Sequence, residues 1–347
     1  MRDAIICECQ ARGTCAQPSG AVPMHYLRAS RTDTTMTSEH GIQPRRLQSG
    51  HPGGGANPCV LYSEDQGIAT ITLNRPKVKN AIDDATYLRL VELLQLTAGR
   101  DSVVAVILTG SAGYFTSGAD LKEVSKKAAG VGQAVGPSMP SVGRPVGRFM
   151  LAVLSFPKVL IAAVNGPAVG IGVTLLPHCD AVYAYGGADS RAPGTEHRRG
   201  AVANTAPQLP TFWTPFLRVG VVPEFGSSVT FPQVLGMSLA NEMLIFGRKL
   251  SLEEALSAGL VSRVITADTE EGFVSQVRNM VRRSVLEQFM GAESSKAFKR
   301  IIQATRRPLL VKVVKEELAE MDKNMHAGHT MAAVRRITGE ATGMSKL

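Results

Sequence analysis

Two glycine-rich segments of this 347-residue chain each lead from an apolar run into a helical pattern. They are TGSAGYFTSGADLKE (109–123) and VNGPAVGIGVTLLPHCD (164–180). Glycines at such a junction let the backbone N–H groups of a helix N-terminus face a negative ligand. That ligand is either a bound phosphate or a charge that develops during a reaction. The second segment has no carboxylate before Asp180, so a general base must come from elsewhere in the chain.

The spacing of these glycines does not fit the common phosphate motifs. A dinucleotide fingerprint needs a third glycine where Leu175 stands and an acidic residue at the end of the next strand, and a P-loop needs Gly-Lys-Ser/Thr. Two N–H groups that converge on one oxygen would instead form an oxyanion hole. The alternative is two ordinary tight turns, and spacing alone leaves both interpretations open.

The elements that position these turns follow from hydrophobic periodicity. Alternation predicts a strand over 68–73, and continuous apolar runs predict strands covered on both faces. We expect further strands over 103–110, 159–164, 181–184 and 261–265. We expect one helix over 82–98, a second that begins at 117 and a third that ends at 154, with a loop over 128–147. Ser251-Leu252-Glu253-Glu254 is a capping box, and Gly259 ends the helix that it begins. Strands that alternate with helices predict an α/β fold with mostly parallel strands.

Composition changes along the chain indicate its organisation. Residues 1–58 lack periodicity and are predicted to be a disordered extension, and residues 186–210 are a polar, basic insertion. The α/β core spans 59–268, and 269–344 form a helical region. The last three residues, Ser345-Lys346-Leu347, match a peroxisomal address that an import receptor reads.

Charge and cysteine usage narrow the classes of partner. The net charge of +9 favours anionic partners, but one Trp, six Tyr and no basic–aromatic interleaving argue against a nucleic-acid module. No apolar run is long enough to span a bilayer. The five cysteines suggest free thiols, and no zinc-like spacing predicts a metal site.

Four blocks occur in the order that they have in the enoyl-CoA hydratase/isomerase, or crotonase, superfamily. They are NRPKVKNAI (74–82), TSGADLKE (116–123), AAVNGPAVGIGVTLLPHCD (162–180) and LSLEEALSAGLVSRVI (250–265). The chain resembles this superfamily over residues 60–345, and residues 212–236 and 241–250 look most like peroxisomal Δ3,Δ2-enoyl-CoA isomerases. The resemblance implies a spiral of repeated ββα units with a helical C-terminal trimerisation region, and thus a homotrimer or hexamer.

The resemblance also implies roles for particular residues. The backbone N–H groups of Ala119 and Ile171 would form the oxyanion hole. Hydratases place two glutamates where this chain has Thr174 and Phe216, whereas isomerases place one further along, here Glu224 in Pro223-Glu224-Phe225-Gly226. Without the resemblance, Glu224 reads equally as a first-turn acid that the helix dipole favours. The CoA-facing residues would be Lys77, Lys79, Ser117, Gly118, Ala119, Asp120, Leu121, Lys122, Gly170 and Ile171.

The expected reaction shifts the double bond of a 3-cis- or 3-trans-enoyl-CoA to 2-trans during β-oxidation of unsaturated fatty acids. Glu224 would serve as single acid and base, with no metal or separate cofactor. Two rivals remain. A dienoyl-CoA isomerase would use an additional carboxylate, for which the sequence shows no evident candidate. A catalytically silent acyl-CoA-binding or scaffold member would bind the ligand without turnover.

Overall fold

The computed structural model describes residues 58–123, 140–187, 208–288 and 290–338. The extension predicted over 1–58 lies outside the described residues except for Pro58, as do most of the insertion at 186–210 and the tripeptide 345–347. The strands are β1 (Val60–Asp65), β2 (Ile68–Leu73), β3 (Ala105–Gly110), β4 (Val159–Val164), β5 (Ala168–Val169), β6 (Ala181–Tyr185), β7 (Phe212–Trp213), β8 (Lys249–Leu250) and β9 (Arg263–Ile265).

Helices account for most of the remaining described residues. The α-helices are α1 (Asp84–Gly99), α3 (Pro145–Ser155), α4 (Ile171–Thr174), α5 (Phe216–Val219), α6 (Ser227–Leu235), α7 (Met237–Leu244), α8 (Leu252–Ser257), α9 (Glu270–Val281), α10 (Gly291–Gln303), α11 (Arg306–His326) and α12 (His329–Thr338). Shorter turns are the 3₁₀ helices η1 (Pro76–Val78) and η2 (Leu176–His178) and the π-helical turn η3 (Arg282–Leu286). No described helix combines the length and the apolar character that a membrane crossing needs.

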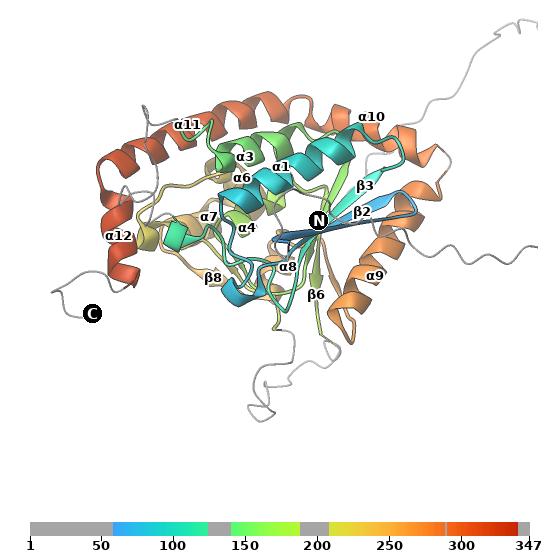
Figure 1. Ribbon diagram of the computed structural model, residues 1–347, viewed down its shortest axis with the longest axis horizontal. Coiled ribbons are helices and arrows are strands. Elements are labelled where there is room, and N and C mark those ends of the chain that lie inside the picture. Colours follow the sequence, from blue (N-terminus) through green and yellow to red (C-terminus); the bar gives the residue numbers. More distant parts are fainter. Residues whose placement is uncertain (1–57, 124–139, 188–207, 289, 339–347) are drawn as a thin grey trace, which may run out of the picture. The chain divides into compact units, whose positions relative to one another are not determined.

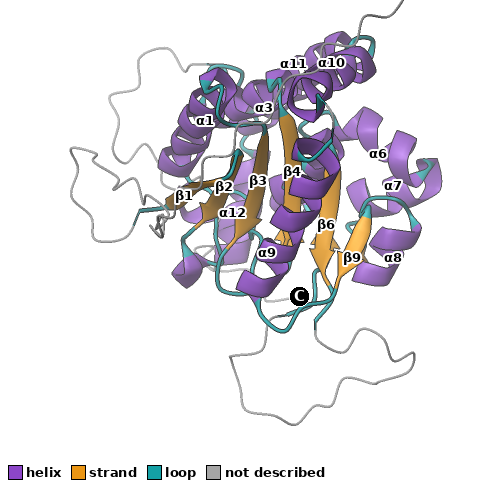
Figure 2. Ribbon diagram, turned by 90° about the vertical axis from the view of Figure 1, so that its right-hand side faces the viewer, coloured by secondary structure: helices purple, strands orange, loops and turns teal. Residues whose placement is uncertain are grey.

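A six-stranded sheet in the order β1-β2-β3-β4-β6-β9 forms the centre of the described core (Figure 2). β1 is antiparallel to β2, and the other neighbours are parallel, as the sequence predicts. Successive residues of β3 point to opposite faces: Val106 and Leu108 join one apolar cluster, and Ala105 and Ile107 join the other. Because both faces are covered, with α9 on one and α1 on the other, the strand is apolar throughout.

Local signals set the ends of several helices. Asp83 caps α1 by accepting a hydrogen bond from the N–H of Thr86, so the helix begins at Asp84, two residues after its predicted start. The capping box of Ser251 and Glu254 is present at α8. In contrast, α3 begins at Pro145, inside the predicted loop 128–147, because proline is favoured in the first turn of a helix.

A second, three-stranded sheet was not anticipated and connects the second glycine turn to distant residues. It has the order β5-β7-β8, with Val169 paired to Trp213 and Trp213 paired to Lys249. These strands are only two residues long, too short for a periodicity signal. The sheet therefore places the Gly170 turn beside Trp213.

The C-terminal region is helical, as predicted. Figure 1 shows α11 running beside α3, and the two helices are in contact. Leu310, Val314 and Leu318 of α11 are buried in the main apolar cluster. The C-terminal helices are therefore part of the same core, and α11 also reaches α6, which follows Glu224.

Candidate active site

A cavity of about 870 Å³ brings together the main candidate residues. Ala119, Ile171 and Glu224 come from three separated segments, and all three line its wall. The wall is predominantly apolar and includes Tyr87, Phe216 and Met321. An apolar cavity with a few convergent polar groups is the usual form of a site for a small molecule.

A short parallel bridge between Ile82 and Ala119 sets the backbone direction at the first predicted oxyanion donor, Ala119. The N–H of Ile82 donates to the Gly118 carbonyl at 2.8 Å, and the N–H of Asp120 donates to the Ile82 carbonyl at 3.0 Å. In this pattern the N–H of Ala119 points away from Ile82. Ala119 also lines the cavity.

The second predicted oxyanion donor, Ile171, lies at the start of α4. Ile171 is the first residue of this helix, so its N–H has no partner inside the helix. The N–H of Gly170, just before it, donates to the Trp213 carbonyl at 2.8 Å. This bond fixes the approach to the helix, and both Gly170 and Ile171 line the cavity wall.

The two glycine turns contact each other through backbone atoms. Gly118 has a φ of +86°, and a Cβ at this position would lie 2.9 Å from the Val169 carbonyl oxygen. A Cβ on Gly172 would lie 2.2 Å from Cγ2 of Thr116, whose hydroxyl is held by a hydrogen bond to the Asn80 carbonyl. Glycine at these two positions lets the segments that carry Ala119 and Ile171 approach each other closely.

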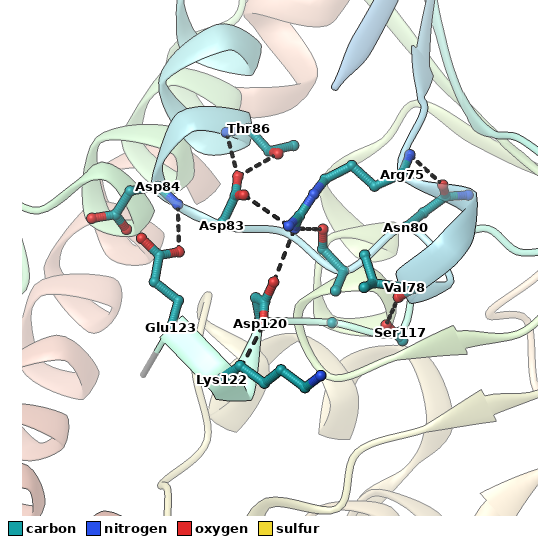
Figure 3. Close-up of polar contacts among 12 residues, drawn as sticks. Arg75, Val78, Asn80, Asp83, Asp84, Thr86, Ser117, Asp120, Lys122 and Glu123 are labelled. Carbon is teal, nitrogen blue, oxygen red and sulfur yellow. Dashed lines mark hydrogen bonds and ion pairs between the residues drawn. The ribbon is translucent and has the colours of Figure 1, made fainter. Parts of the chain in front are cut away.

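Arg75 ties the segment of Ala119 to the start of α1 (Figure 3). Its guanidinium lies 3.0 Å from a carboxylate oxygen of Asp83 and 3.1 Å from one of Asp120, and it donates to the Ala81 carbonyl at 2.6 Å. The Ser117 hydroxyl donates to the Val78 carbonyl at 3.1 Å. Asp120 and Ser117 line the cavity, and their side chains also hold the segment that carries Ala119 in place.

Glu224 lies in the turn before α6, at the cavity wall. Its side chain is partly open to the cavity but surrounded by protein. Burial, with the nearby negative charge of Glu317, raises the pKa of its carboxyl from 4.5 to about 8. A carboxyl group with a pKa near neutrality can both accept and return a proton.

The two hydratase positions hold side chains that cannot exchange a proton at neutral pH. Thr174 is fully buried in α4, and its hydroxyl has no hydrogen-bond partner among the described residues. Phe216 lines the cavity as an apolar wall. The arrangement therefore offers Glu224, and not a pair of glutamates at those positions, for proton transfer.

The predicted CoA-facing residues divide into two groups. Lys79, Ser117, Gly118, Ala119, Asp120, Leu121, Gly170 and Ile171 line the cavity. Lys77 and Lys122 are exposed and do not line it. The structure instead adds Arg144, Arg218 and Lys249 to the wall, and no sequence pattern had singled them out. Arg218 Cζ and Lys249 Nζ lie over the Trp213 ring, 5.8 and 4.9 Å from its centroid.

The expectation that no second carboxylate candidate exists is wrong. Asp84 and Glu123 also line the cavity, and the backbone N–H of Asp84 donates to a carboxylate oxygen of Glu123 at 3.0 Å (Figure 3). The Tyr87 hydroxyl is buried beside Glu224 without a hydrogen-bond partner in the described part of the chain. These residues looked like ordinary first-turn acids and a core tyrosine, and only the fold brings them to the cavity.

Across the described ranges, no group of three or more His, Cys, Asp or Glu side chains is arranged to hold a metal ion. Cys59 and Cys179 are free thiols.

Comparison with known proteins identifies the class to which this site belongs. A sequence model of the family "Enoyl-CoA hydratase/isomerase" matches residues 63–333. The chain therefore belongs to the enoyl-CoA hydratase/isomerase family, as the four sequence blocks indicate.

Several curated relatives are enoyl-CoA delta isomerases. The chain is 35% identical over 254 residues to enoyl-CoA delta isomerase 2 of Rattus norvegicus, covering 73% of this chain and 58% of the relative. It is 41% identical over 216 residues to the human protein of the same name, covering 62% and 48%. Enoyl-CoA delta isomerase 3, peroxisomal, of Mus musculus is 37% identical over 212 residues, covering 61% and 58%. The chain thus spans about half the length of these relatives.

Solved structures confirm the fold. Pseudomonas aeruginosa OdaA superposes with a TM-score of 0.67 at 31% identity, covering 80% of this chain and 98% of that one. An enoyl-CoA hydratase/isomerase from Pseudoalteromonas atlantica gives a TM-score of 0.67 at 28% identity, covering 83% and 100%. The predicted crotonase-like α/β fold with a helical C-terminal region is therefore confirmed.

Proposed function

We propose that this protein converts 3-cis- and 3-trans-enoyl-CoA to 2-trans-enoyl-CoA in the β-oxidation of unsaturated fatty acids. The observation that carries the proposal is Glu224 with its raised pKa on a cavity wall that Ala119 and Ile171 also line. The names of the mammalian relatives support the same reaction.

The proposed reaction needs only these groups. The carboxylate of Glu224 removes a proton from C2, the C3=C4 electron pair forms part of the resulting dienolate, and the negative charge moves to the thioester oxygen. The N–H groups of Ala119 and Ile171 hold that oxygen. Protonated Glu224 then returns the proton to C4, which leaves the double bond between C2 and C3. The atoms balance without water, metal or redox cofactor.

Cations on the cavity wall support a CoA thioester as the substrate. Lys79, Arg144, Arg218 and Lys249 line the same cavity as Glu224. Three of them, Lys79, Arg218 and Lys249, have exposed side chains that stack near Tyr114 or Trp213. Basic side chains held at the opening of an apolar cavity suit a ligand with phosphates at one end and an acyl chain at the other.

The cavity carboxylates of Asp84 and Glu123 favour a second candidate, the isomerisation of a dienoyl-CoA. The full-length protein should be assayed spectrophotometrically with 3-cis-, 3-trans- and dienoyl-CoA substrates. Turnover of the 3-enoyl substrates supports the proposal, and preference for the dienoyl substrate overturns it. Binding of CoA esters without turnover of any of them identifies a catalytically silent member.

The raised pKa of Glu224 predicts a pH dependence of kcat/KM. The free enzyme needs Glu224 as a carboxylate, so kcat/KM should fall by about tenfold per pH unit below a midpoint near pH 8. Initial rates at low substrate between pH 5.5 and 9.5 measure this limb. A flat profile through pH 8 would contradict the role of Glu224.

We further propose that the protein works in peroxisomes, with an import receptor as partner, as a homotrimer or hexamer. The name of the mouse relative supports this location. The exposed apolar side chains of Phe298, Ile301 and Ile302 on α10 support contact between copies. Light scattering of the purified chain measures the oligomeric state, and fluorescence microscopy of the tagged protein measures its location.

A further inference from the structure

The turn that carries Glu224 has an unusual backbone. Phe225 has a φ of +60° and Gly226 a φ of +72°, so two successive residues adopt the left-handed region. Phenylalanine rarely does so, and such strain persists only where surrounding contacts hold it. The N–H of Glu224 donates to the Ser227 hydroxyl at 3.1 Å, but this local bond does not connect the turn to the rest of the fold.

His178 of η2 holds one side of this turn. Its Nε2 lies 2.6 Å from the Phe225 carbonyl oxygen, and its ring stacks on the Phe225 ring with centroids 4.5 Å apart. Burial lowers the pKa of His178 to about 4, so the imidazole is neutral at the pH of the proposed reaction. A neutral imidazole with its N–H at Nε2 donates to the carbonyl and adds no charge near Glu224.

Glu317 of α11 holds the other side. One of its carboxylate oxygens accepts a hydrogen bond from the N–H of Gly226 at 2.6 Å. The other accepts from the N–H of Ser228 at 3.1 Å and from its hydroxyl at 2.6 Å. Glu317 is only 8% exposed, and its carboxylate accepts all three of these hydrogen bonds. A carboxylate that accepts several hydrogen bonds is favoured in its ionised form.

We propose that Glu317 is a positioning residue that fixes the 224–228 turn through Gly226 and Ser228 and places a second negative charge beside Glu224. The inference rests on the proposed function only in taking Glu224 as the base. Glu317 does not line the cavity, so it acts through Glu224 and its turn and not on the substrate. α11 thereby contributes to the chemistry from a region of the chain otherwise expected only to mediate oligomerisation.

Several other charged or titratable groups lie in the same cavity as Glu224 or contact its turn. They are Tyr87 on α1, His178 on η2, and the cavity residues Lys79, Asp84, Tyr114, Asp120, Glu123, Arg144, Arg218 and Lys249. Of the charged groups, Glu317 is the one whose charge raises the pKa of Glu224, and burial adds the larger contribution. Burial also raises the pKa of Glu317, but the hydrogen bonds from Ser228 and Gly226 oppose that shift. The two carboxyls therefore titrate as a coupled pair in which Glu317 ionises first.

The test is a ¹³C NMR titration of glutamate carboxyls in the full-length protein, with the Glu224 signal assigned from Glu224→Gln. In Glu317→Gln, which removes the charge but keeps the shape, the Glu224 midpoint should fall by about one pH unit. The acidic limb of kcat/KM should move with it. Glu316→Gln is the matched control: Glu316 is exposed on the same helix, and its midpoint effect should be nil. A folded Glu317→Gln protein with an unchanged Glu224 midpoint overturns the inference.

A second set of measurements covers the case in which Glu317→Gln does not fold. In the wild type, the Glu317 signal should titrate at a lower pH than the Glu224 signal, and the Glu224 signal should respond to both steps. Ser228→Ala removes one hydrogen bond but keeps the charge, so its Glu224 midpoint should stay near that of the wild type. Independent titration of the two wild-type signals overturns the inference. Because NMR midpoints need no turnover, loss of the proposed activity and loss of this coupling are read separately.

Discussion

In the Glu224→Gln variant, isomerisation of 3-enoyl-CoA should fall by about 10²–10⁴-fold, the contribution expected of a general base. Glutamine has the shape of glutamate but cannot accept the C2 proton. The wall that binds the acyl chain is otherwise unchanged, so the dissociation constant of a non-reactive acyl-CoA should stay close to that of the wild type. Initial rates with 3-trans-enoyl-CoA and calorimetric titration with a saturated acyl-CoA measure the two effects.

The same variant has a characteristic pH dependence of stability. The folded-state pKa of Glu224 lies above the ordinary value of 4.5, so the protonated form favours folding. Its contribution is fully present below pH 4.5 and is lost as pH rises towards about 8. Glu224→Gln should therefore unfold at a higher temperature than the wild type at pH 9, and the difference should shrink at pH 5. Thermal melts at both values measure this.

Two controls separate catalysis from general damage. Asp84→Asn and Glu123→Gln change carboxylates on the same cavity wall. If Glu224 is the single acid and base, both should keep most of the 3-enoyl activity. Wild-type rates in Glu224→Gln, or an equal loss in Glu123→Gln, would contradict the assignment of the base.

The Gly118→Ala variant should lose about 10²–10³-fold in kcat, as on removal of one oxyanion donor. A Cβ there would lie 2.9 Å from the Val169 carbonyl oxygen, which is backbone and cannot rotate away. The φ of +86° adds a conformational cost of about 1–2 kcal/mol for alanine. Separating the two segments moves the N–H of Ala119 relative to that of Ile171, while Glu224 stays in place.

Gly99→Ala is the matched control for this substitution. Gly99 is exposed at the end of α1, and a Cβ there would meet no atom within 4 Å. Rates and melting temperature of Gly99→Ala should match the wild type, whereas Gly118→Ala should melt lower and react slowly. A folded Gly118→Ala protein with undiminished kcat would show that the Gly118 contact does not position the oxyanion hole.

Much of the sheet could be predicted from the sequence because its signals are local. The strands at 68–73 and 159–164 are confirmed at both ends, since apolar runs bounded by turn residues define them. The capping box at Ser251 also depends only on residues within one turn. The two-residue strands β5, β7 and β8 were missed because they form only where three distant segments meet.

The candidate site shows the same division. The chain order of the four blocks, with Thr174 and Phe216 at the hydratase positions, singled out Glu224 among the carboxylates, and the structure brings it to the cavity with Ala119 and Ile171. Lys77, Lys79 and Lys122 were expected to face CoA because they lie in blocks that resemble CoA-facing segments of the family, yet of the three only Lys79 reaches the wall. The direction of a side chain depends on the turn that carries the residue, and the composition of the sequence does not give that direction.

The sequence by itself determined the family and the parallel sheet, because each depends on residue types at short, fixed spacings. The resemblance to the family then implied Glu224 as the candidate base. Only the tertiary structure decided which groups surround that base. Glu317, His178 and Tyr87 come from α11, η2 and α1, and they meet the Glu224 turn through packing between distant segments. The pKa of Glu224 depends on burial and on neighbouring charge, and both exist only after the chain has folded.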